Sequence, residues 1–449
     1  MRRPWLLGPA LLLACDAPAA PAPAAATPPP PPAEPTAPVA PPPKLHPVTV
    51  VAPDAGLHVA AYRNGELSLH LLGDDVFVSG SGDLARADAS GQLVHLEHAL
   101  TGQARSTWRF DYWRVLAFGG RWPGDAWLVT EYVAGRTNSP PHVHRRVGDE
   151  WRAAVTKDRM LYWYYEAVIP WHSGQVLGLR TYTTDPEIRM DLETPKKTRK
   201  AMYAQLATTH RGFDVLGDTP SATTMQLDKR LAQVIAVAAA PTGEVFVLGS
   251  ASDDLDSPRF VQRWSLAGVS TVDTMPDRTE CESLSVRAAD EVYVGCVQRH
   301  EGNYTGVVRR FDGATWTADP VPPNQGIVRV AVAPSGDLWA LAYPDDQTGK
   351  SPQELWHRAA RPAQWQRTSL PALRFVDAPG DPPGERITPV LPTELLARGP
   401  DDVWIVARTD LNTRVGETST TREVVLRSRP SGEPLRMRDD AELARAVSQ

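Results

Sequence analysis

Short apolar runs separated by polar turns recur along the chain from residue 57 to about residue 436. The most regular run follows a turn of Gly, Asp or Glu, and its second residue is usually aromatic. Seven copies place this residue, called the ring position below, at Phe77, Trp127, Leu177, Phe246, Tyr293, Trp339 and Trp404. The ring positions lie 46 to 69 residues apart, inside or just beyond the range for four-stranded propeller blades. The pattern predicts an all-β fold, a seven-bladed β-propeller with four antiparallel strands per blade.

The sixth blade shows the predicted four-strand unit most plainly. Its strands are expected at residues 328–333, 338–343, 354–358 and 364–369. The seventh blade is expected at residues 394–397, 403–408, 422–427 and 433–437. Residues 48–51 alternate as an edge strand would, and we expect them to pair with the last blade. Such pairing would close the ring and protect its exposed strand edges.

The recurring aromatic residues are interpreted as packing groups. Rings at one strand position, repeated around a propeller, fill the space between neighbouring blades, and each buries about 150 to 250 Å². The Gly and Asp residues before them supply turn chemistry, because Gly allows a positive φ and Asp accepts local backbone N–H bonds. They are therefore not expected to bind a metal. The third blade departs from the pattern with Leu177 in place of a ring.

Length and charge fit this organisation. The chain has 449 residues, of which 42% are hydrophobic, and its formal net charge of −6 has the two signs intermixed. A nucleic-acid or anionic-membrane surface needs a basic field, so we expect no nucleic-acid partner. The predicted divisions are a signal peptide at 1–14, a tether at 15–45, the propeller at 46–438 and a polar tail at 439–449.

The N-terminus has the features of an export signal. A basic start is followed by an apolar run over residues 5–14 and then by Cys15, and the run is too short to span a bilayer. The stretch Leu12-Leu13-Ala14-Cys15 resembles the lipobox of bacterial lipoproteins. That resemblance implies cleavage before Cys15 and a lipid anchor on it, with the protein in the cell envelope, either periplasmic or at the cell surface. The alternative is an ordinary secretory signal.

Residues 16–43 are almost entirely Pro and Ala. Such a segment cannot bury apolar surface and favours polyproline II, so it is expected to act as a stiff tether. At about 3.1 Å per residue it could hold the folded part up to about 85 Å from the membrane. The N-terminal lipid would then be the only membrane attachment.

The ring-position repeats, and Trp-bearing outer hairpins such as residues 311–316, resemble those of bacterial propeller lipoproteins with no assigned activity. The resemblance covers nearly the whole mature chain and implies an architecture only. The chain departs from sialidase-like propellers, whose Asp-box reads Ser-x-Asp-x-Gly-x-x-Trp, because its Asp residues lie directly beside Gly. The signature repeats of quinone-dependent dehydrogenases are absent as well.

Cys281 and Cys296 flank a predicted hairpin of the fifth blade that turns near residues 289–290. In an oxidising compartment they could form a disulfide across its first two strands, closing a loop of about 15 residues for roughly 3 kcal/mol. If both stay reduced and buried, they are small core residues.

In the usual wiring of a propeller, loops between second and third strands share one face with the connections between blades. We call this the loop-rich face, and the face with the short hairpins the tight-turn face. The long segments fall on the loop-rich face, at residues 135–141, 181–200, 251–258, 298–305, 344–351, 371–392 and 409–420. Loops on a rigid scaffold usually carry binding groups, so this face is predicted to bind a partner.

Two aromatic clusters enter neighbouring blades on the loop-rich face. They are Trp108, Phe110, Tyr112 and Trp113 before the second blade, and Tyr162, Trp163, Tyr164 and Tyr165 before the third. Trp113 and Trp163 stand at equal distances before their ring positions. Such rings can stack on sugars, peptides or cations. The alternative is that they cover the blade junction and pack against residues 181–200.

His142 and His144 are the candidates for metal binding, because alternate residues of a strand share a face and neutral imidazole is a good ligand. No third ligand is identifiable, so two ordinary strand histidines are the simpler interpretation and no metal is expected. The acidic run at residues 253–256 lacks the spacing and Gly of a calcium loop. We find no Gly-rich phosphate loop, nucleophile elbow or zinc-protease helix, and expect no cofactor.

The sequence therefore favours a non-enzymatic, lipid-anchored envelope protein that binds a protein, peptide or glycan through its loop-rich face. The alternative is a propeller hydrolase or lyase acting on an envelope or extracellular polymer, with groups such as His142 and His144 at the channel mouth. A carboxylate or His cluster converging there within about 5 to 9 Å, with a strongly shifted pKa, would favour the enzyme. An aromatic, weakly charged rim would favour binding.

Overall fold

The computed structural model divides the chain into two units, residues 1–44 and residues 45–449, and every described residue belongs to the second unit. The described residues are 48–50, 56–64, 66–80, 82–96, 111–134, 137–138, 142–154, 163–183, 209–217, 224–227, 231–252, 257–275, 279–300, 303–319, 321, 325–344, 354–360, 364–371, 373–375, 386–388, 390–411, 420–429 and 432–438. Cys15, the tether, Trp108, Tyr162, residues 253–256 and the tail at 439–449 lie outside them. Within these ranges, no helix is long and apolar enough to cross a membrane.

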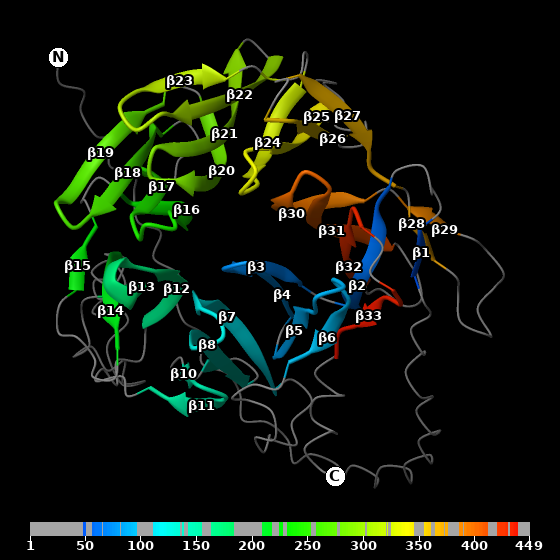
Figure 1. The fold of residues 1–449 in the computed structure, drawn as a ribbon, viewed down its shortest axis with the longest axis horizontal. Helices are drawn as coiled ribbons and strands as arrows, with labels where there is room; N and C mark the ends of the chain where they lie inside the picture. Colours follow the sequence, from blue (N-terminus) through cyan, green and yellow to red (C-terminus); the bar gives the residue numbers. More distant parts are fainter. Residues whose placement is uncertain are drawn as a thin grey trace, which may run out of the picture. The chain divides into compact units, whose positions relative to one another are not determined.

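Seven sheets follow one another around a ring in the order of the chain, as predicted (Figure 1). The first three blades are β3 (Ser68–Leu72), β4 (Asp75–Gly80), β5 (Asp83–Ala87) and β6 (Leu93–His95); β7 (Asp111–Arg121), β8 (Asp125–Ala134), β10 (His142–Val147) and β11 (Glu150–Ala153); and β12 (Trp163–Pro170), β13 (Val176–Thr183), β14 (Thr209–Leu216) and β15 (Thr224–Gln226). The short strand β9 (Thr137–Asn138) pairs with β8, and the 3-10 helix η2 (His172–Gly174) connects β12 to β13.

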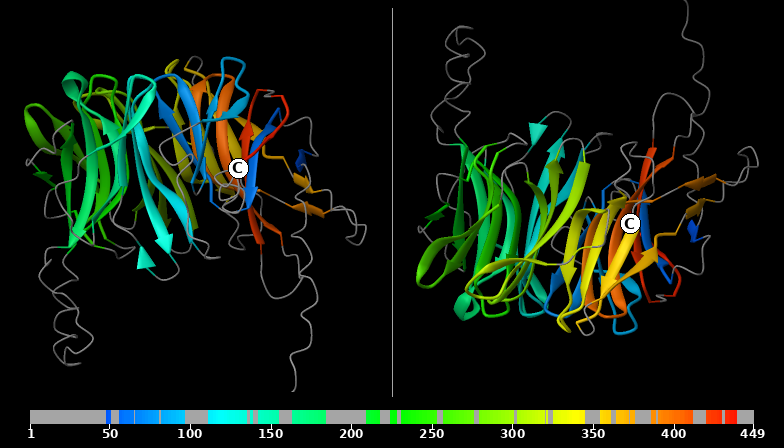
Figure 2. Two further views of the ribbon diagram at one scale, coloured as in Figure 1. Left: turned by 90° about the horizontal axis from the view of Figure 1, so that it is seen from below. Right: turned by 90° about the horizontal axis from the view of Figure 1, so that it is seen from above.

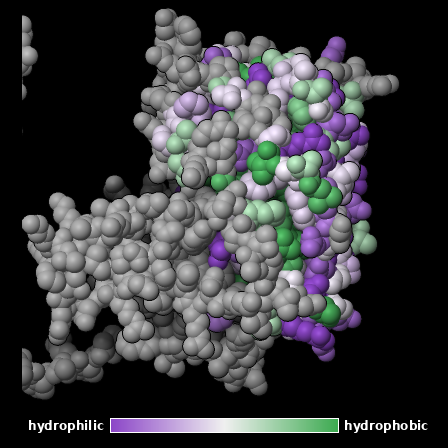
Figure 3. All heavy atoms as spheres, turned by 90° about the vertical axis from the view of Figure 1, so that its left-hand side faces the viewer, coloured by the Kyte–Doolittle hydropathy of each residue, from purple (hydrophilic) through white to green (hydrophobic). Residues whose placement is uncertain are grey.

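The next three blades have the same plan. They are β16 (Gln233–Ala239), β17 (Val245–Ser250), β18 (Arg259–Ser265) and β19 (Gly268–Thr274); β20 (Thr279–Ala288), β21 (Glu291–His300), β22 (Asn303–Phe311) and β23 (Trp316–Asp319); and β24 (Gln325–Val332), β25 (Leu338–Pro344), β26 (Glu354–Arg358) and β27 (Trp365–Ser369). The strands run between the two faces of the ring (Figure 2). The side near β19 shows hydrophilic and hydrophobic residues intermixed (Figure 3).

The seventh blade closes the ring with a strand from the other end of the chain. It consists of β30 (Leu391–Gly399), β31 (Asp402–Leu411), β32 (Thr420–Arg427) and then β2 (His58–Asn64), which pairs antiparallel with β32. Outside β2, the short strand β33 (Leu435–Arg436) pairs with it in parallel. Residues 433–437 were expected to be the fourth strand, but β2 takes that place.

The prediction that residues 48–51 close the ring is wrong. β1 (Val48–Val50) pairs with β28 (Leu373–Phe375), which pairs in turn with β29 (Arg386–Thr388) in a separate three-stranded sheet. The closing strand must be covered on both faces as well as paired at its edges. β2 meets this demand because Val59 packs in the cluster toward blade six, while Ala60 and Ala61 pack in the cluster toward blade one.

All seven ring positions are buried, with exposed fractions between 0 and 6%. The apolar core is divided into clusters that each join neighbouring blades. Phe246, for example, packs with Cys281 and Val294 of the next blade, and Trp127 packs with Val168 and Val176. The interpretation of the rings as packing groups between blades is confirmed.

Six blades also share a β-bulge between their first and second strands. The extra residue lies eleven positions before the ring position each time, at Leu116, Glu166, Ile235, Glu282, Val328 and Thr393. Bulges of this kind leave backbone groups outside the strand ladder. Arg329 uses two of them: its Nε donates to the Thr393 carbonyl at 3.0 Å, and its Nη1 donates to the Glu282 carbonyl. This side chain links the first strands of blades five, six and seven.

Candidate functional site

The aromatic clusters lie where β7 and β12 begin, at the loop-rich face. Strand pairing places Trp113 directly opposite Tyr132 of β8, and Trp163 directly opposite Tyr182 of β13. The two first strands, β7 and β12, are packed against each other. Two neighbouring blades therefore repeat the same Trp–Tyr pair at the same level of the strands. The Tyr partners were not singled out from the sequence, because the register between the strands was needed to find them.

Tyr112 and Tyr164 are next to these pairs in the same strands, opposite Val133 and Thr181. For these two Tyr residues, and for Trp113, Trp163 and their partners Tyr132 and Tyr182, the structure describes the backbone only. Three further members of the predicted clusters, Trp108, Phe110 and Tyr162, lie outside the described residues, and so do most of the long segments assigned to the loop-rich face.

Tyr165 does not belong to an exposed rim, contrary to the expectation. Its side chain is 5% exposed, and its hydroxyl donates to Asp214 Oδ2 at 3.1 Å, an oxygen that also lies 2.9 Å from Arg180 Nε. The ring passes over Gly178, where an added Cβ would meet Tyr165 Cδ1 at 2.6 Å. Depth along the strand explains the difference, because Tyr165 lies two positions further into β12 than its first residue, Trp163, and reaches the apolar cluster of the junction. Tyr165 is a packing residue of the junction between blades two and three.

His142 and His144 do share one face of β10, with ring centroids 6.5 Å apart and ring planes 13° apart. His142 is exposed, and partial burial lowers its pKa, whereas His144 is only 7% exposed. In the part of the chain that the structure describes, no group of three or more His, Cys, Asp or Glu residues could hold a metal ion. His142 therefore lies at the surface of blade two and His144 beneath it, and the described residues provide no third ligand beside them.

A basic residue lies directly opposite the ring position in six blades, and the sequence analysis missed it. The pairs are Phe77 with Arg86, Trp127 with Arg145, Phe246 with Arg263, Tyr293 with Arg310, Trp339 with His357, and Trp404 with Arg427. Blade three, with Leu177 opposite Val215, lacks the pair. Arg or His on the third strand of each blade was visible in the sequence, but only the register shows that it faces the ring.

In five of these blades, the acidic residue two positions before the ring position contacts this basic residue. Arg145 Nε lies 2.7 Å from Asp125 Oδ1, with its guanidinium 5.4 Å from the centre of the Trp127 ring. Corresponding contacts join Arg86 to Asp75, Arg263 to Glu244, His357 to Asp337, and Arg427 to Asp402. The turn acids were expected to make local turn contacts, but here they also bind the basic residue of the third strand, and in blades two and seven they hold its guanidinium over the buried Trp ring. They stabilise the tight-turn face.

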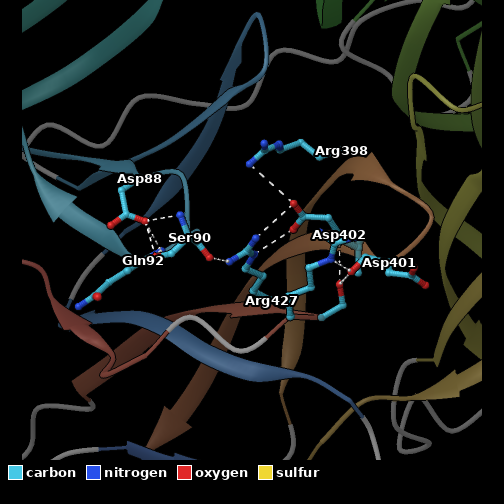
Figure 4. Close-up of polar contacts among 10 residues, drawn as sticks. Asp88, Ser90, Gln92, Arg398, Asp401, Asp402 and Arg427 are labelled. Carbon is cyan, nitrogen blue, oxygen red and sulfur yellow. Dashed lines mark hydrogen bonds and ion pairs between the residues drawn. The ribbon is translucent and has the colours of Figure 1, made fainter.

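At the junction between blades seven and one, the basic residue of this pair also contacts the neighbouring blade (Figure 4). Arg427 Nε donates to Asp402 Oδ1 at 2.9 Å, and Arg427 Nη1 donates to the Ser90 carbonyl of blade one at 3.3 Å. The Ser90 turn is held by Asp88, whose Oδ1 accepts the Ser90 N–H at 2.9 Å. An ion pair of blade seven therefore contacts the backbone of blade one.

Two carboxylates join the same blades at the loop-rich end. Glu423 Oε2 accepts the Leu67 N–H at 2.5 Å, and Glu394 Oε2 accepts the Leu69 N–H at 2.6 Å. Burial raises the pKa of both carboxyl groups, against the opposing effect of these hydrogen bonds. A pair of raised-pKa carboxyls at a channel is what a catalytic site would need. Here each carboxylate holds a backbone N–H of the neighbouring blade.

At the junction between blades five and six, two serines of β20 make a similar contact, and Ser283 has the place in its strand that Glu394 has in β30. The hydroxyls of Ser283 and Ser285 accept the N–H groups of Val330 and Val332, each at 2.9 Å. Backbone N–H groups of the next blade are thus bound by neutral hydroxyls at one junction and by carboxylates at another. Through their own hydrogen bonds to blade one, Glu394 and Glu423 contribute to ring closure. In the same fifth blade, a disulfide joins Cys281 to Cys296, which are paired across β20 and β21.

No protein family matches the chain, and neither does any curated protein. Similar solved structures include YCF48 bound to D1 peptide, with 11% identity, 83% of this chain and 100% of that chain covered, and a TM-score of 0.43. An oligogalacturonate lyase in complex with manganese has 12% identity, 86% and 98% coverage, and a TM-score of 0.45. The PQQ-bound aldose sugar dehydrogenase of Streptomyces coelicolor has 13% identity, 86% and 99% coverage, and a TM-score of 0.35. Likeness at this level concerns the fold alone.

Proposed function

We propose that the protein binds a protein, peptide or glycan partner through the loop-rich face of blades two and three. The observation that carries the proposal is the repeated Trp–Tyr pair, Trp113 with Tyr132 and Trp163 with Tyr182, at the same level of adjacent blades. Aromatic residues dominate the energy of binding surfaces because they combine a large apolar area with a polar edge. A rigid ring of sheets is a suitable scaffold for such a surface.

We further propose that a lipid on Cys15 anchors the protein in the cell envelope, with the Pro/Ala segment as its tether. The support is the run Leu12-Leu13-Ala14-Cys15 after a basic and apolar start. Growing cells with an alkyne fatty acid tests the anchor: the wild-type chain should be labelled and should sediment with membranes. A Cys15→Ser variant should lose both properties, and a labelled Cys15→Ser chain would contradict the anchor.

The binding proposal is tested by capture from an envelope extract of the source cells. Trp113→Ala and Trp163→Ala should each reduce the amount of captured partner at least tenfold, the effect expected of a central aromatic contact. The matched control is Leu266→Ala, since Leu266 is 75% exposed on the β18–β19 turn at the opposite face. Equal capture by all four chains would contradict the proposal.

The nature of the partner follows from a second treatment of the same extract. Protease digestion before capture should abolish binding of a protein or peptide and leave a glycan partner intact. All variants are compared only after their thermal unfolding shows that they are folded. Release of oligosaccharides or peptides from the extract by the wild-type chain, and not by Trp113→Ala, would instead favour the hydrolase or lyase alternative.

A further inference from the structure

The junction between blades four and five ends in polar residues on the loop-rich side. Gln233, Ser250 and Arg259 are paired in register across β16, β17 and β18, so the three side chains lie on one face of blade four. Below them on that face, Leu248 and Val261 pack in the apolar cluster that contains Cys281 of blade five. These polar residues therefore lie between the apolar core of the junction and the loop-rich face.

Arg259 is buried at this junction. The residue is only 5% exposed, and among the described residues its Nε and Nη1 have no hydrogen-bond partner. No ion pair joins Arg259 to any residue that the structure describes. Burying a guanidinium in this way costs free energy unless an acceptor of opposite charge meets it. Two other buried guanidiniums, those of Arg358 and Arg427, each have a carboxylate within reach.

A second donor without a hydrogen-bond partner among the described residues lies on the face of blade five that packs on blade four. Thr279 begins β20 and lies two positions before Cys281, so it shares the face that packs on blade four. The residue is 4% exposed, and its Oγ1 has no hydrogen-bond partner. Ser250, which is fully buried, donates its hydroxyl to the Ser252 carbonyl at 2.7 Å. We call Gln233, Ser250, Arg259 and Thr279 the Arg259 cluster.

We infer that the Arg259 cluster binds a small oxyanion, such as a carboxylate, sulfate or phosphate group. The planar guanidinium presents parallel N–H donors that match two oxygens of such a group, and a hydroxyl beside it can supply a further donor. Arg259 and Thr279 come from different blades, so the bound anion joins them across the junction. This site is distinct from the aromatic pairs of blades two and three and does not depend on their function.

The test is the thermal unfolding midpoint of the full chain, measured while sodium acetate, sulfate or inorganic phosphate replaces chloride at constant ionic strength. Binding to the folded state raises the midpoint in a saturable way. We expect such a rise with at least one of the three anions. A response to acetate identifies carboxylate as the ligand group, whereas a response to sulfate or phosphate identifies a sulfated or phosphorylated one.

Three substitutions assign the response to the cluster. Arg259→Met should abolish it, and Thr279→Val should weaken the apparent affinity by about tenfold or less, the effect of one hydrogen bond. Arg152→Met, at a surface position where the side chain is 63% exposed, should leave it unchanged. If Arg259→Met does not fold, Arg259→Lys replaces it and must also weaken the response.

Three results would overturn the inference. The first is a wild-type chain that shows no saturable response, and the second is a response that Arg259→Met retains in full. The third is a response that appears only after Asp253, Asp254 and Asp256 are replaced by Asn. That result would mean that a carboxylate of the chain itself, from the segment between β17 and β18, occupies the position assigned to the anion.

Discussion

The carboxylate of Glu423 accepts a hydrogen bond from the backbone N–H of Leu67 at 2.5 Å, although 356 positions separate the two residues. The bond joins the last blade to the residue just before β3, the first strand of the first blade. Glu394 makes the neighbouring bond to Leu69, and Arg427 makes the contact with Ser90 at the opposite face. The ring is therefore closed at both faces by polar side chains of blade seven, with β2 and its apolar contacts between them.

Replacing Glu423 separates its roles as acceptor and as charge. Glu423→Leu should lower the free energy of unfolding by about 1 to 3 kcal/mol, because the buried Leu67 N–H loses its acceptor. Glu423→Gln keeps an acceptor oxygen and should cost less. Denaturant unfolding of the three chains measures the difference. Equal stability of the Leu and Gln variants would show that the hydrogen bond does not hold the closure.

His70 makes the stability depend on pH. Burial lowers its pKa from 6.5 to about 4, while its Nε2 lies 2.8 Å from Ser79 Oγ. Between these two pH values the unfolded chain binds more protons than the folded one, so the free energy of unfolding falls as the pH decreases. His70→Asn should give a flatter pH profile from 6.5 to 4, measured by denaturant unfolding. Parallel profiles for the two chains would contradict this role.

Gly91 leaves room for the closure contact of Arg427. It has a φ of +85°, and an added Cβ would lie 1.6 Å from Arg427 Nη1. Gly91→Ala should therefore combine a backbone cost of about 1 to 2 kcal/mol with the loss of the Arg427–Ser90 bond, worth about 1 kcal/mol more.

Gly73→Ala is the control for this substitution, because Gly73 has a φ of +64° and no atom within 4 Å of the added Cβ. Its cost should be the backbone term alone. Chemical unfolding of both variants gives the comparison. A Gly91→Ala chain no less stable than Gly73→Ala would mean that the side chain of Arg427 moves aside without loss.

The disulfide of blade five should contribute to stability through the unfolded chain. Cys281 and Cys296 are 15 residues apart, and a loop of that length corresponds to about 3 kcal/mol in the chain-entropy estimate. A reductant should lower the unfolding midpoint of the wild-type chain and leave a Cys281→Ala/Cys296→Ala chain unchanged. The same reductant effect on both chains would exclude the disulfide as its cause.

The sequence predicted the blades because each repeats one local signal, a polar turn followed by an aromatic residue in an apolar strand. In blade six, the expected strand 354–358 matches β26, Glu354–Arg358. Ring closure could not be predicted in the same way, since it depends on which distant strand fits between β32 and the neighbouring blades. Alternation in residues 48–51 and in β2 is similar, and only packing on both faces distinguishes them.

The candidate site, like the fold, could be predicted from the sequence only where a local pattern repeats. Equal spacing of Trp113 and Trp163 indicated a repeated feature, and strand pairing then added Tyr132 and Tyr182. Tyr165 was assigned to the same surface because it is adjacent in sequence, yet it lies further into β12 and packs in the junction. The Arg259 cluster combines residues from four strands of two blades, so no sequence motif contains it.

The most direct measurement of the central claim is photo-cross-linking in the source cells. A photoreactive phenylalanine analogue is placed at position 113, at position 163, or at position 266 on the opposite face, and cross-linked products are compared after illumination. The aromatic pairs of blades two and three predict the same discrete product from positions 113 and 163 and none from position 266. Products of equal yield from all three positions, or a product from position 266 alone, would contradict the assignment of the loop-rich face as the binding surface.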